Sequence, residues 1–187
     1  MQTSDKGIAF LERHEGVVLK AYRDPVGIWT IGAGLTAASG VVKPSAGMTI
    51  TADEASALTR KALTANYEPA VEAAMPGAEQ HEFDAGVSFH WNTGAIGRAS
   101  WVRAWRIKAW EKVQAKLALW SKAKGRVLAG LKRRRDEEFK LLRFGIYERH
   151  RVQPAERSGA FRCAGRSGDD GRTPPAIHKV GLRTWRQ

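Results

Sequence analysis

Two carboxylates and a hydroxyl, Glu15, Asp24 and Thr30, lie close together in the run HEGVVLKAYRDPVGIWTIGAG at residues 14–34. Hydrolysis of an acetal needs one carboxyl group that keeps its proton, to protonate the leaving oxygen. It also needs a second, ionised carboxylate that positions water or acts as a nucleophile. A threonine hydroxyl beside them could hold the attacking water. Spacing alone does not distinguish such a site from two solvated charges and a strand threonine.

The elements expected around these residues would place the carboxylates on facing surfaces. Residues 4–15 predict a short helix that ends at Gly16, so that Glu15 is its last residue. The strand formers of 18–36 predict a small antiparallel sheet with a tight turn near 24–27. If the sheet folds back on the helix, the two carboxylates face each other across a cleft.

The chain from about residue 51 to 147 is predicted to be helical. Residues 51–75 begin with a capping box between Thr51 and Glu54 and form one long helix, bent near Pro69. After a loop over 37–49 and this long helix, further helices are expected over 79–92, over 99–124 with a break inside that run, and over 130–147.

The composition is that of one globular domain, alone or with an appendage. The 187 residues are 43% hydrophobic and include seven Trp, which excludes a disordered chain. No apolar run approaches the roughly 20 residues of a membrane-spanning helix. The N-terminal MQTSDKGIAFLERHEG lacks the apolar core of a secretory signal, so we expect synthesis in the cytoplasm and release by another route.

The net charge of +12 indicates attraction to polyanions and does not choose between nucleic acid, membrane surfaces and wall polymers. Residues 151–187 contain seven Arg and one Lys against three acidic residues, with five Gly and three Pro, and predict a poorly ordered basic tail. A small irregular appendage that binds wall or nucleic acid is the alternative. Cys163 is the single cysteine, which excludes an internal disulfide, and neither it nor the five scattered His indicates a metal site.

Three segments together resemble the phage-type lysozymes (glycoside hydrolase family 24, the endolysins). The opening run matches the pattern E-G, then L-x-A-Y-x-D, then G-x-x-T-I-G-x-G. Residues 83–94, with FDAGVSF and NTG, are similar to the family's F-D-A-L-V-S-F-x-x-N-x-G, and residues 130–138 are similar to its G-L-x-x-R-R-x-x-E helix. The resemblance covers about residues 5–147, in the same order along the chain.

The resemblance implies an α+β, two-lobed lysozyme-like fold, with a small antiparallel sheet lobe, a long connecting helix and a larger helical lobe. Residues 1–150 would form this catalytic domain, and the tail 151–187 matches nothing in the family. The implied reaction is hydrolysis of the β-1,4 bond between N-acetylmuramic acid and N-acetylglucosamine in peptidoglycan. Glu15 matches the family's general acid, Asp24 its second carboxylate, and Thr30 the threonine that completes the site with a water. The resemblance also suggests inversion, for which carboxyl groups are about 6.5–9.5 Å apart.

Two positions depart from the family pattern. Leu35 stands where the family often has His, and we expect retained activity with altered packing there. Gly86 replaces the usual Leu of the F-D-A-L-V-S-F helix, which costs about 1 kcal/mol of helix propensity relative to Ala.

Other residues have a structural and a functional interpretation. His90 and Asn92 lie near the end of a helix that would border the cleft, so they are candidate substrate-binding residues, with capping or packing as the alternative. Arg133–Arg135 is interpreted as a solvated face. The Trp residues at near-helical spacing are interpreted as core rather than as a sugar platform: Trp101, Trp105, Trp110 and Trp120.

The resemblance thus implies a muramidase, a phage or prophage endolysin made in the host cytoplasm that acts on the cell wall after release. We expect peptidoglycan as its partner, no organic cofactor or metal, no specific nucleic acid, and a monomer. The tail 151–187 could add contact with an anionic envelope surface. Three alternatives stay open: a lytic transglycosylase, a non-catalytic basic module that binds wall or nucleic acid, and a wall-piercing lysozyme carried by a virion.

Overall fold

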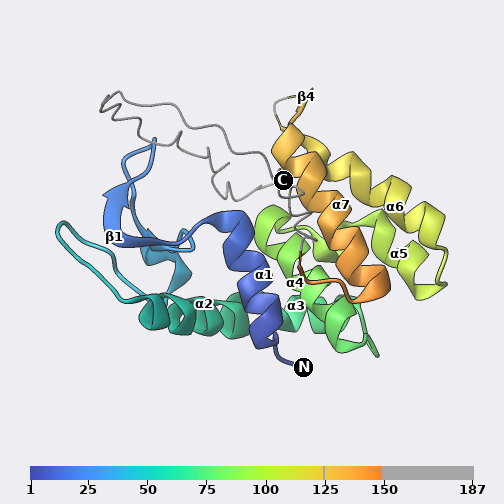
Figure 1. The fold of residues 1–187 in the computed structure, drawn as a ribbon, viewed down its shortest axis with the longest axis horizontal. Helices are drawn as coiled ribbons and strands as arrows, with labels where there is room; N and C mark the ends of the chain where they lie inside the picture. The colour runs from blue at the N-terminus through green and yellow to red at the C-terminus, as the bar shows by residue number, and fades with distance from the viewer. Residues whose placement is uncertain (124, 149–187) are drawn as a thin grey trace, which may run out of the picture. The chain divides into compact units, whose positions relative to one another are not determined.

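The computed structural model describes residues 1–123 and 125–148, which form a small sheet, two connecting helices in series and a group of packed helices (Figure 1). In chain order the elements are α1 (Asp5–Glu15), β1 (Val18–Arg23), β2 (Trp29–Gly32), α2 (Ala52–Asn66), α3 (Glu68–Ala74), α4 (Gln80–Thr93), α5 (Ser100–Arg106), α6 (Trp110–Ala118), β3 (Lys122–Ala123), β4 (Arg126–Val127) and α7 (Ala129–Phe144). Short 3-10 helices occupy Ala37–Ser39, Ile96–Arg98 and Leu119–Ser121. The α+β, two-lobed fold is confirmed, whereas the predicted tail lies outside the described residues.

Helix α1 and the sheet follow the sequence prediction closely. The Ser4 side chain accepts a hydrogen bond from the backbone N–H of Gly7 and caps the helix, and Gly16 ends it at a φ of 68°. Strands β1 and β2 pair antiparallel, with Tyr22 directly opposite Thr30. Directly opposed residues project from the same face of a sheet, so these two side chains share one face.

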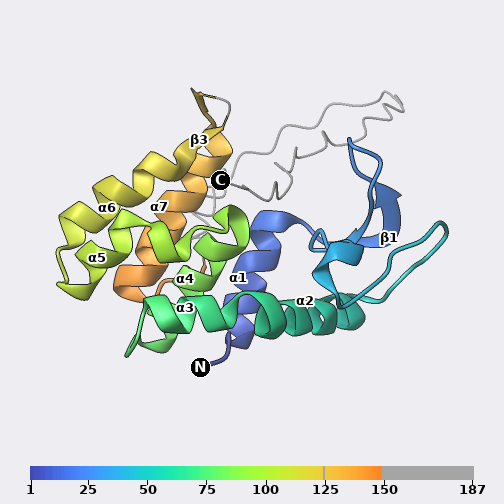
Figure 2. The same ribbon diagram turned by 180° about the vertical axis from the view of Figure 1, so that it is seen from behind.

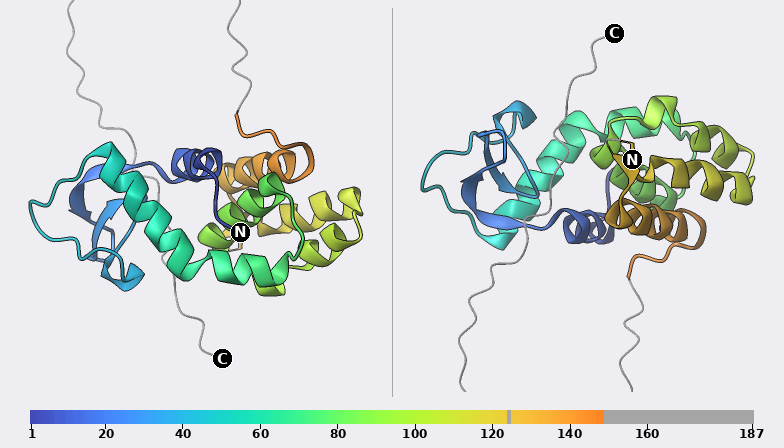
Figure 3. Two further views of the ribbon diagram at one scale, coloured as in Figure 1. Left: turned by 90° about the horizontal axis from the view of Figure 1, so that it is seen from below. Right: turned by 90° about the horizontal axis from the view of Figure 1, so that it is seen from above.

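The connection between sheet and helical lobe is broken where one long helix was predicted. The capping box of Thr51 and Glu54 is confirmed. However, α2 ends at Asn66, and Tyr67 leaves the helical conformation, with φ −126° and ψ −45°. Pro69 lies in the first turn of α3, where its missing N–H costs no helical hydrogen bond. The helix therefore restarts before the proline instead of bending at it, and α2 and α3 run in series beneath the sheet and α4 (Figures 2 and 3).

Helix α4 is the centre of the helical lobe and is buried on nearly all sides, as its apolar run requires. Gly86 on this helix faces α3 directly. A Cβ at this position would lie 2.7 Å from Met75 Sδ and 2.9 Å from Val71 Cγ1. The glycine therefore lets two helices approach closely, a packing reason that outweighs its poor helix propensity.

The predicted break inside 99–124 is confirmed between α5 and α6. Lys108 sits there at a φ of 52°, in the left-handed region, and its Nζ donates to Glu82 Oε1 at 2.5 Å. Trp105 Nε1 donates to the same oxygen at 2.9 Å. Burial alone would raise the pKa of Glu82, but these donors lower it below its ordinary value. Trp101 and Trp105 are buried core residues, as predicted.

The end of the described chain differs from expectation in two ways. The hairpin β3–β4 was not predicted, because its strands are only two residues long. Helix α7 ends at Phe144, where Gly145 takes a left-handed conformation, and not at residue 147. Tyr147 instead packs back, and its hydroxyl donates to Asp84 Oδ2 at 2.7 Å.

Candidate active site

Glu15 lies at the C-terminal end of α1, where that helix meets α7. Its side chain is only 8% exposed, and its Oε1 accepts a hydrogen bond from Arg134 Nη1 at 2.6 Å. The preceding turn also contacts α7: His14 Nε2 lies 3.2 Å and Arg13 Nη2 3.4 Å from Glu137 Oε2. These contacts fix the direction in which α1 presents Glu15.

Arg134 is held by three elements at once. Its Nε donates to Glu138 Oε1 at 3.0 Å, and its Nη2 donates to the carbonyl oxygen of Ser88 on α4, also at 3.0 Å. Its side chain is 6% exposed. Because all three guanidinium nitrogens are engaged, the orientation of the donor that reaches Glu15 is set by the surrounding fold.

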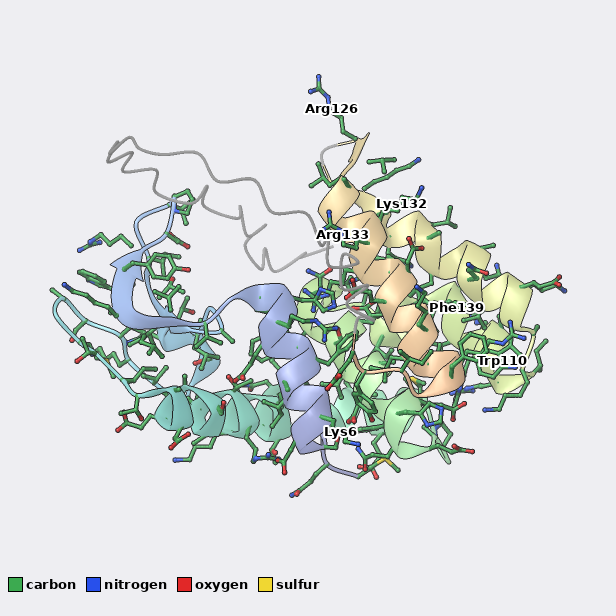
Figure 4. The ribbon with its side chains drawn as sticks, in the orientation of Figure 1. Lys6, Trp110, Arg126, Lys132, Arg133 and Phe139 are labelled. Carbon is green, nitrogen blue, oxygen red and sulfur yellow. The ribbon has the colours of Figure 1, made fainter. Side chains whose placement is uncertain are left out.

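Arg135 is buried beside it, with 1% of its side chain exposed. Its Nη2 donates to Asn92 Oδ1 at 2.9 Å and to Glu138 Oε1 at 3.0 Å, and the guanidinium lies over the ring of Phe89. Burial lowers the pKa of Arg135, an effect that the charge of Glu138 opposes. The interpretation of Arg133–Arg135 as a solvated face is therefore wrong for Arg134 and Arg135, and only Arg133 is exposed (Figure 4).

Asp24 begins the turn between β1 and β2. Its Oδ1 accepts hydrogen bonds from the backbone N–H groups of Val26, at 3.0 Å, and Ile28, at 2.8 Å. The turn closes through Gly27 N–H, which donates to the Asp24 carbonyl and has a φ of 84°. The two donors stabilise negative charge on Oδ1 and fix the carboxylate plane. Within the described part of the chain, no hydrogen bond engages Oδ2.

Thr30 lies on β2 and is 3% exposed. Its Oγ1 donates to the carbonyl oxygen of Ile28 at 3.1 Å, so the hydroxyl proton is engaged and the oxygen lone pairs remain acceptors. Asp24 follows Tyr22 by two residues along the strand direction, and Tyr22 faces Thr30 across the ladder. One hairpin therefore carries both the carboxylate and the hydroxyl.

Tyr22 connects the two carboxylates electrostatically. Burial raises the pKa of its hydroxyl, and the charges of Asp24 and Glu15 raise it further. The structure places Glu15 at the end of α1 and Asp24 at the turn between β1 and β2, and their joint action at one site stays a prediction.

The candidate substrate-binding residues His90 and Asn92 lie at the C-terminal end of α4. His90 is half-buried against the ring of Tyr67, at 5.6 Å between ring centroids, and burial lowers its pKa. Burial raises the pKa of Tyr67, and the charge of Glu15 raises it further. Asn92 Oδ1 is occupied by Arg135. Binding of sugar by either residue stays a prediction.

Leu35, at the position where His is usual in the resemblance, is a core residue. It is 3% exposed, and its backbone pairs with Ile31 in an isolated bridge. It contributes packing beneath the sheet rather than a polar group to the site.

Sequence reasoning missed Arg134, Glu138 and Tyr22 as members of the site. A signal for the first two was present. Arg134 and Glu138 fall on the same helical stripe as Leu131 and Leu141, at intervals of three and four residues, so the core face of α7 includes charged residues. A charge on a core stripe indicates a buried ion pair.

Within residues 1–123 and 125–148, no group of three or more His, Cys, Asp or Glu side chains is placed to hold a metal ion. No helix in that part of the chain is long and apolar enough to span a membrane. A depression of about 560 Å³ lies at the other end of α1, lined by residues that include Lys6, His81 and Tyr147, and it contains neither carboxylate.

The small sheet and the helical lobe are those of the lysozyme fold, which solved phage endolysins share. The family model for phage lysozyme matches residues 12–138, and the chain belongs to that family. The endolysin of Salmonella phage P22 is 34% identical over 125 residues, which cover 66% of this chain and 86% of that protein.

Two solved structures are similar over most of their length. The endolysin from Escherichia coli O157:H7 phage FAHEc1 is 31% identical, with a TM-score of 0.64, covering 80% of this chain and 98% of that one. The muramidase domain of SpmX from Asticaccaulis excentricus is 30% identical, with a TM-score of 0.65, covering 75% and 97%. Family membership makes this chain a peptidoglycan-degrading hydrolase of the endolysin kind.

Proposed function

We propose that this enzyme hydrolyses the β-1,4 bond between N-acetylmuramic acid and N-acetylglucosamine in peptidoglycan, with Glu15 as general acid. The observation that carries the proposal is the buried carboxylate of Glu15 at a helix end, held by Arg134 Nη1 at 2.6 Å, with the Asp24 carboxylate at the turn of the sheet that follows. The muramidase activity named for a relative of the same fold supports the choice of bond.

In the proposed reaction, Glu15 transfers its proton to the glycosidic oxygen as the bond from that oxygen to the anomeric carbon breaks. Negative charge then develops on Glu15, and Arg134 Nη1, at 2.6 Å, is already oriented to stabilise it. Because the Arg134 side chain is held by α4 and α7, the transition state requires no reorganisation of this donor.

Water attacks the anomeric carbon from the opposite face. Asp24 Oδ2 accepts one proton of the water, while Oδ1 stays bound to the backbone N–H groups of its turn. Thr30 Oγ1 donates to Ile28 and so accepts the second O–H of the water, which orients its lone pair toward carbon. The products are a new hemiacetal of inverted configuration, a protonated Asp24 and an ionised Glu15, which exchange protons with solvent before the next cycle.

The proposed biological setting is host lysis by a phage or prophage. Its support is that two relatives, from Salmonella phage P22 and from Acyrthosiphon pisum secondary endosymbiont phage 1, are endolysins. We propose that the protein reaches the wall after release from the host cytoplasm and acts as a monomer on peptidoglycan.

Clearing of a suspension of purified peptidoglycan tests the proposal. We expect Glu15→Gln to lose at least about 100-fold in rate, the size of a general-acid contribution. Glu12→Gln is the matched control, because Glu12 lies on the same helix and its carboxylate contacts Ser56 instead of Arg134. Full activity in Glu15→Gln would refute the assignment, and equal losses in both variants would indicate damage to α1 alone.

A further inference from the structure

Glu138 is a buried carboxylate that the reaction above does not use. Its side chain is 1% exposed. Its Oε1 accepts from Arg134 Nε at 3.0 Å, from Arg135 Nη2 at 3.0 Å and from Ser88 Oγ at 2.8 Å. Its Oε2 lies 2.9 Å from Arg135 Nε. One carboxylate thus joins both buried arginines to α4.

The buried charges balance in number. Arg134 and Arg135 supply two positive charges, and Glu138 and Glu15 supply two negative charges when both are ionised. A charge buried without a partner costs several kcal/mol, so the two arginines need negative charge beside them, and Glu138 contacts both. If Glu138 were absent, Glu15 alone would face both guanidinium groups.

That situation conflicts with the role of an acid. Glu15 must carry a proton when substrate binds, yet two nearby positive charges favour its ionised form. Glu138 reduces the conflict, because its negative charge offsets one of the two positive charges while it anchors Arg134 at Nε. Arg134 can then hold Glu15 in place while Glu15 stays protonated.

We propose that Glu138 is a positioning residue for the general acid: it orients Arg134 on Glu15 and offsets the charges of Arg134 and Arg135, so that Glu15 still takes up a proton. The inference rests on the function proposed above. It gives the last residue of the R-R-x-x-E pattern on α7 a role other than helix packing.

Several other groups act on Glu15 and set the background for a test. The charge of Glu15 raises the pKa of Tyr22 on β1 and of Tyr67 at the end of α2, and the charge of Asp24 also raises the pKa of Tyr22. On α1 itself, Arg13 and His14 pair with Glu137 of α7. None of these groups changes in the variants that follow, so differences between variants report on the arginine and glutamate cluster.

The test is the pH dependence of kcat/KM on peptidoglycan, whose alkaline limb reports loss of the proton from the essential acid. In Glu138→Gln we expect this limb to move about one pH unit lower. The matched control is Asp136→Asn, which removes the same charge from an exposed position on the same helix, and its limb should stay with the wild type.

Two compensating variants separate charge from packing. Arg135→Gln combined with Glu138→Gln restores the balance of charges, so the limb should return most of the way to its wild-type position. Glu138→Asp keeps the charge with a shorter reach, so the limb should stay in place while kcat falls. A limb that moves equally in Glu138→Gln and Asp136→Asn, or that stays low in the double variant, overturns the proposal.

Separate control measurements report on folding and on activity. Thermal unfolding by circular dichroism shows which variants fold. If Glu138→Gln does not fold, Arg135→Gln carries the test. This substitution removes a positive charge, so it must move the alkaline limb to higher pH. No movement, or movement to lower pH, overturns the proposal.

NMR titration of the Glu15 carboxyl carbon, assigned with Glu15→Gln, should show the same shifts without any substrate. If the wild type fails to cleave peptidoglycan but these shifts appear, the proposed function fails and the role of Glu138 in the proton affinity of Glu15 stands.

Discussion

A small-to-large substitution near the beginning of α1 should reveal how the fold holds the helix that presents Glu15. A Cβ added to Gly7 would lie 2.5 Å from Asp84 Cγ and 2.8 Å from both carboxylate oxygens. Asp84 is 1% exposed on α4, so it has little room to retreat. The glycine is therefore required by this contact, because its own backbone angles are helical.

The magnitude follows from the hydrogen bonds that Asp84 accepts. The donors are Ser4 N–H at 3.1 Å, Ser4 Oγ at 2.5 Å, Gln80 Nε2 at 2.9 Å and Tyr147 OH at 2.7 Å. A hydrogen bond to a charged group contributes about 1.5–3 kcal/mol, so displacing two of the four costs about 3–6 kcal/mol. Ala gains about 1 kcal/mol over Gly in helix propensity. We expect Gly7→Ala to lower the free energy of unfolding by about 2–5 kcal/mol.

Urea denaturation of a double-mutant cycle with Asp84→Ala measures this coupling. Asp84→Ala is itself destabilising, but it removes the obstacle to a methyl group at position 7. In that background Gly7→Ala should become neutral or stabilise the protein by up to about 1 kcal/mol. An equal cost of Gly7→Ala in both backgrounds, or a gain in the wild type, would show that Asp84 is not what demands the glycine.

Three further outcomes are expected. Glu15 and Asp24 both raise the pKa of Tyr22, so Glu15→Gln and Asp24→Asn should each lower the pH at which Tyr22 ionises. Ultraviolet absorbance measures this titration. An unchanged titration in either variant would place that carboxylate elsewhere. Gly86→Ala should lower the free energy of unfolding by about 1–3 kcal/mol in urea through overpacking against α3, and a more stable variant would refute the close helix contact. Arg134→Met should lower kcat with little change in KM, because Arg134 contacts the acid; a change confined to KM would assign it to substrate binding.

The N-terminal elements were predictable because local signals agree with the fold. Ser4 and Gly16 bound α1, and the Asp24 turn with its glycine has the hydrogen bonds typical of a short connection between strands. These signals act over a few residues, so tertiary contacts only confirm them. The same is true of the capping box at Thr51.

The charged interior was less predictable, because its physics depends on distant partners. Arg134 and Arg135 look like part of a solvated run until Glu138, Ser88 and Glu15 are placed around them. The same holds for Gly86, whose effect on stability depends on how closely α3 approaches α4. Helix periodicity predicts which face of α7 is buried. It does not predict which groups of other elements lie against that face.

The central claim is that Glu15 and Asp24 together add water across a glycosidic bond of peptidoglycan. Digestion of purified peptidoglycan in ¹⁸O-labelled water, followed by mass spectrometry of the released fragments, tests it directly. We predict one ¹⁸O atom at each new N-acetylmuramic acid end with the wild type, and no such ends above background with Glu15→Gln or Asp24→Asn. Unlabelled 1,6-anhydro ends would contradict the claim and identify a transglycosylase, and intact glycan strands would leave a wall-binding protein without this activity.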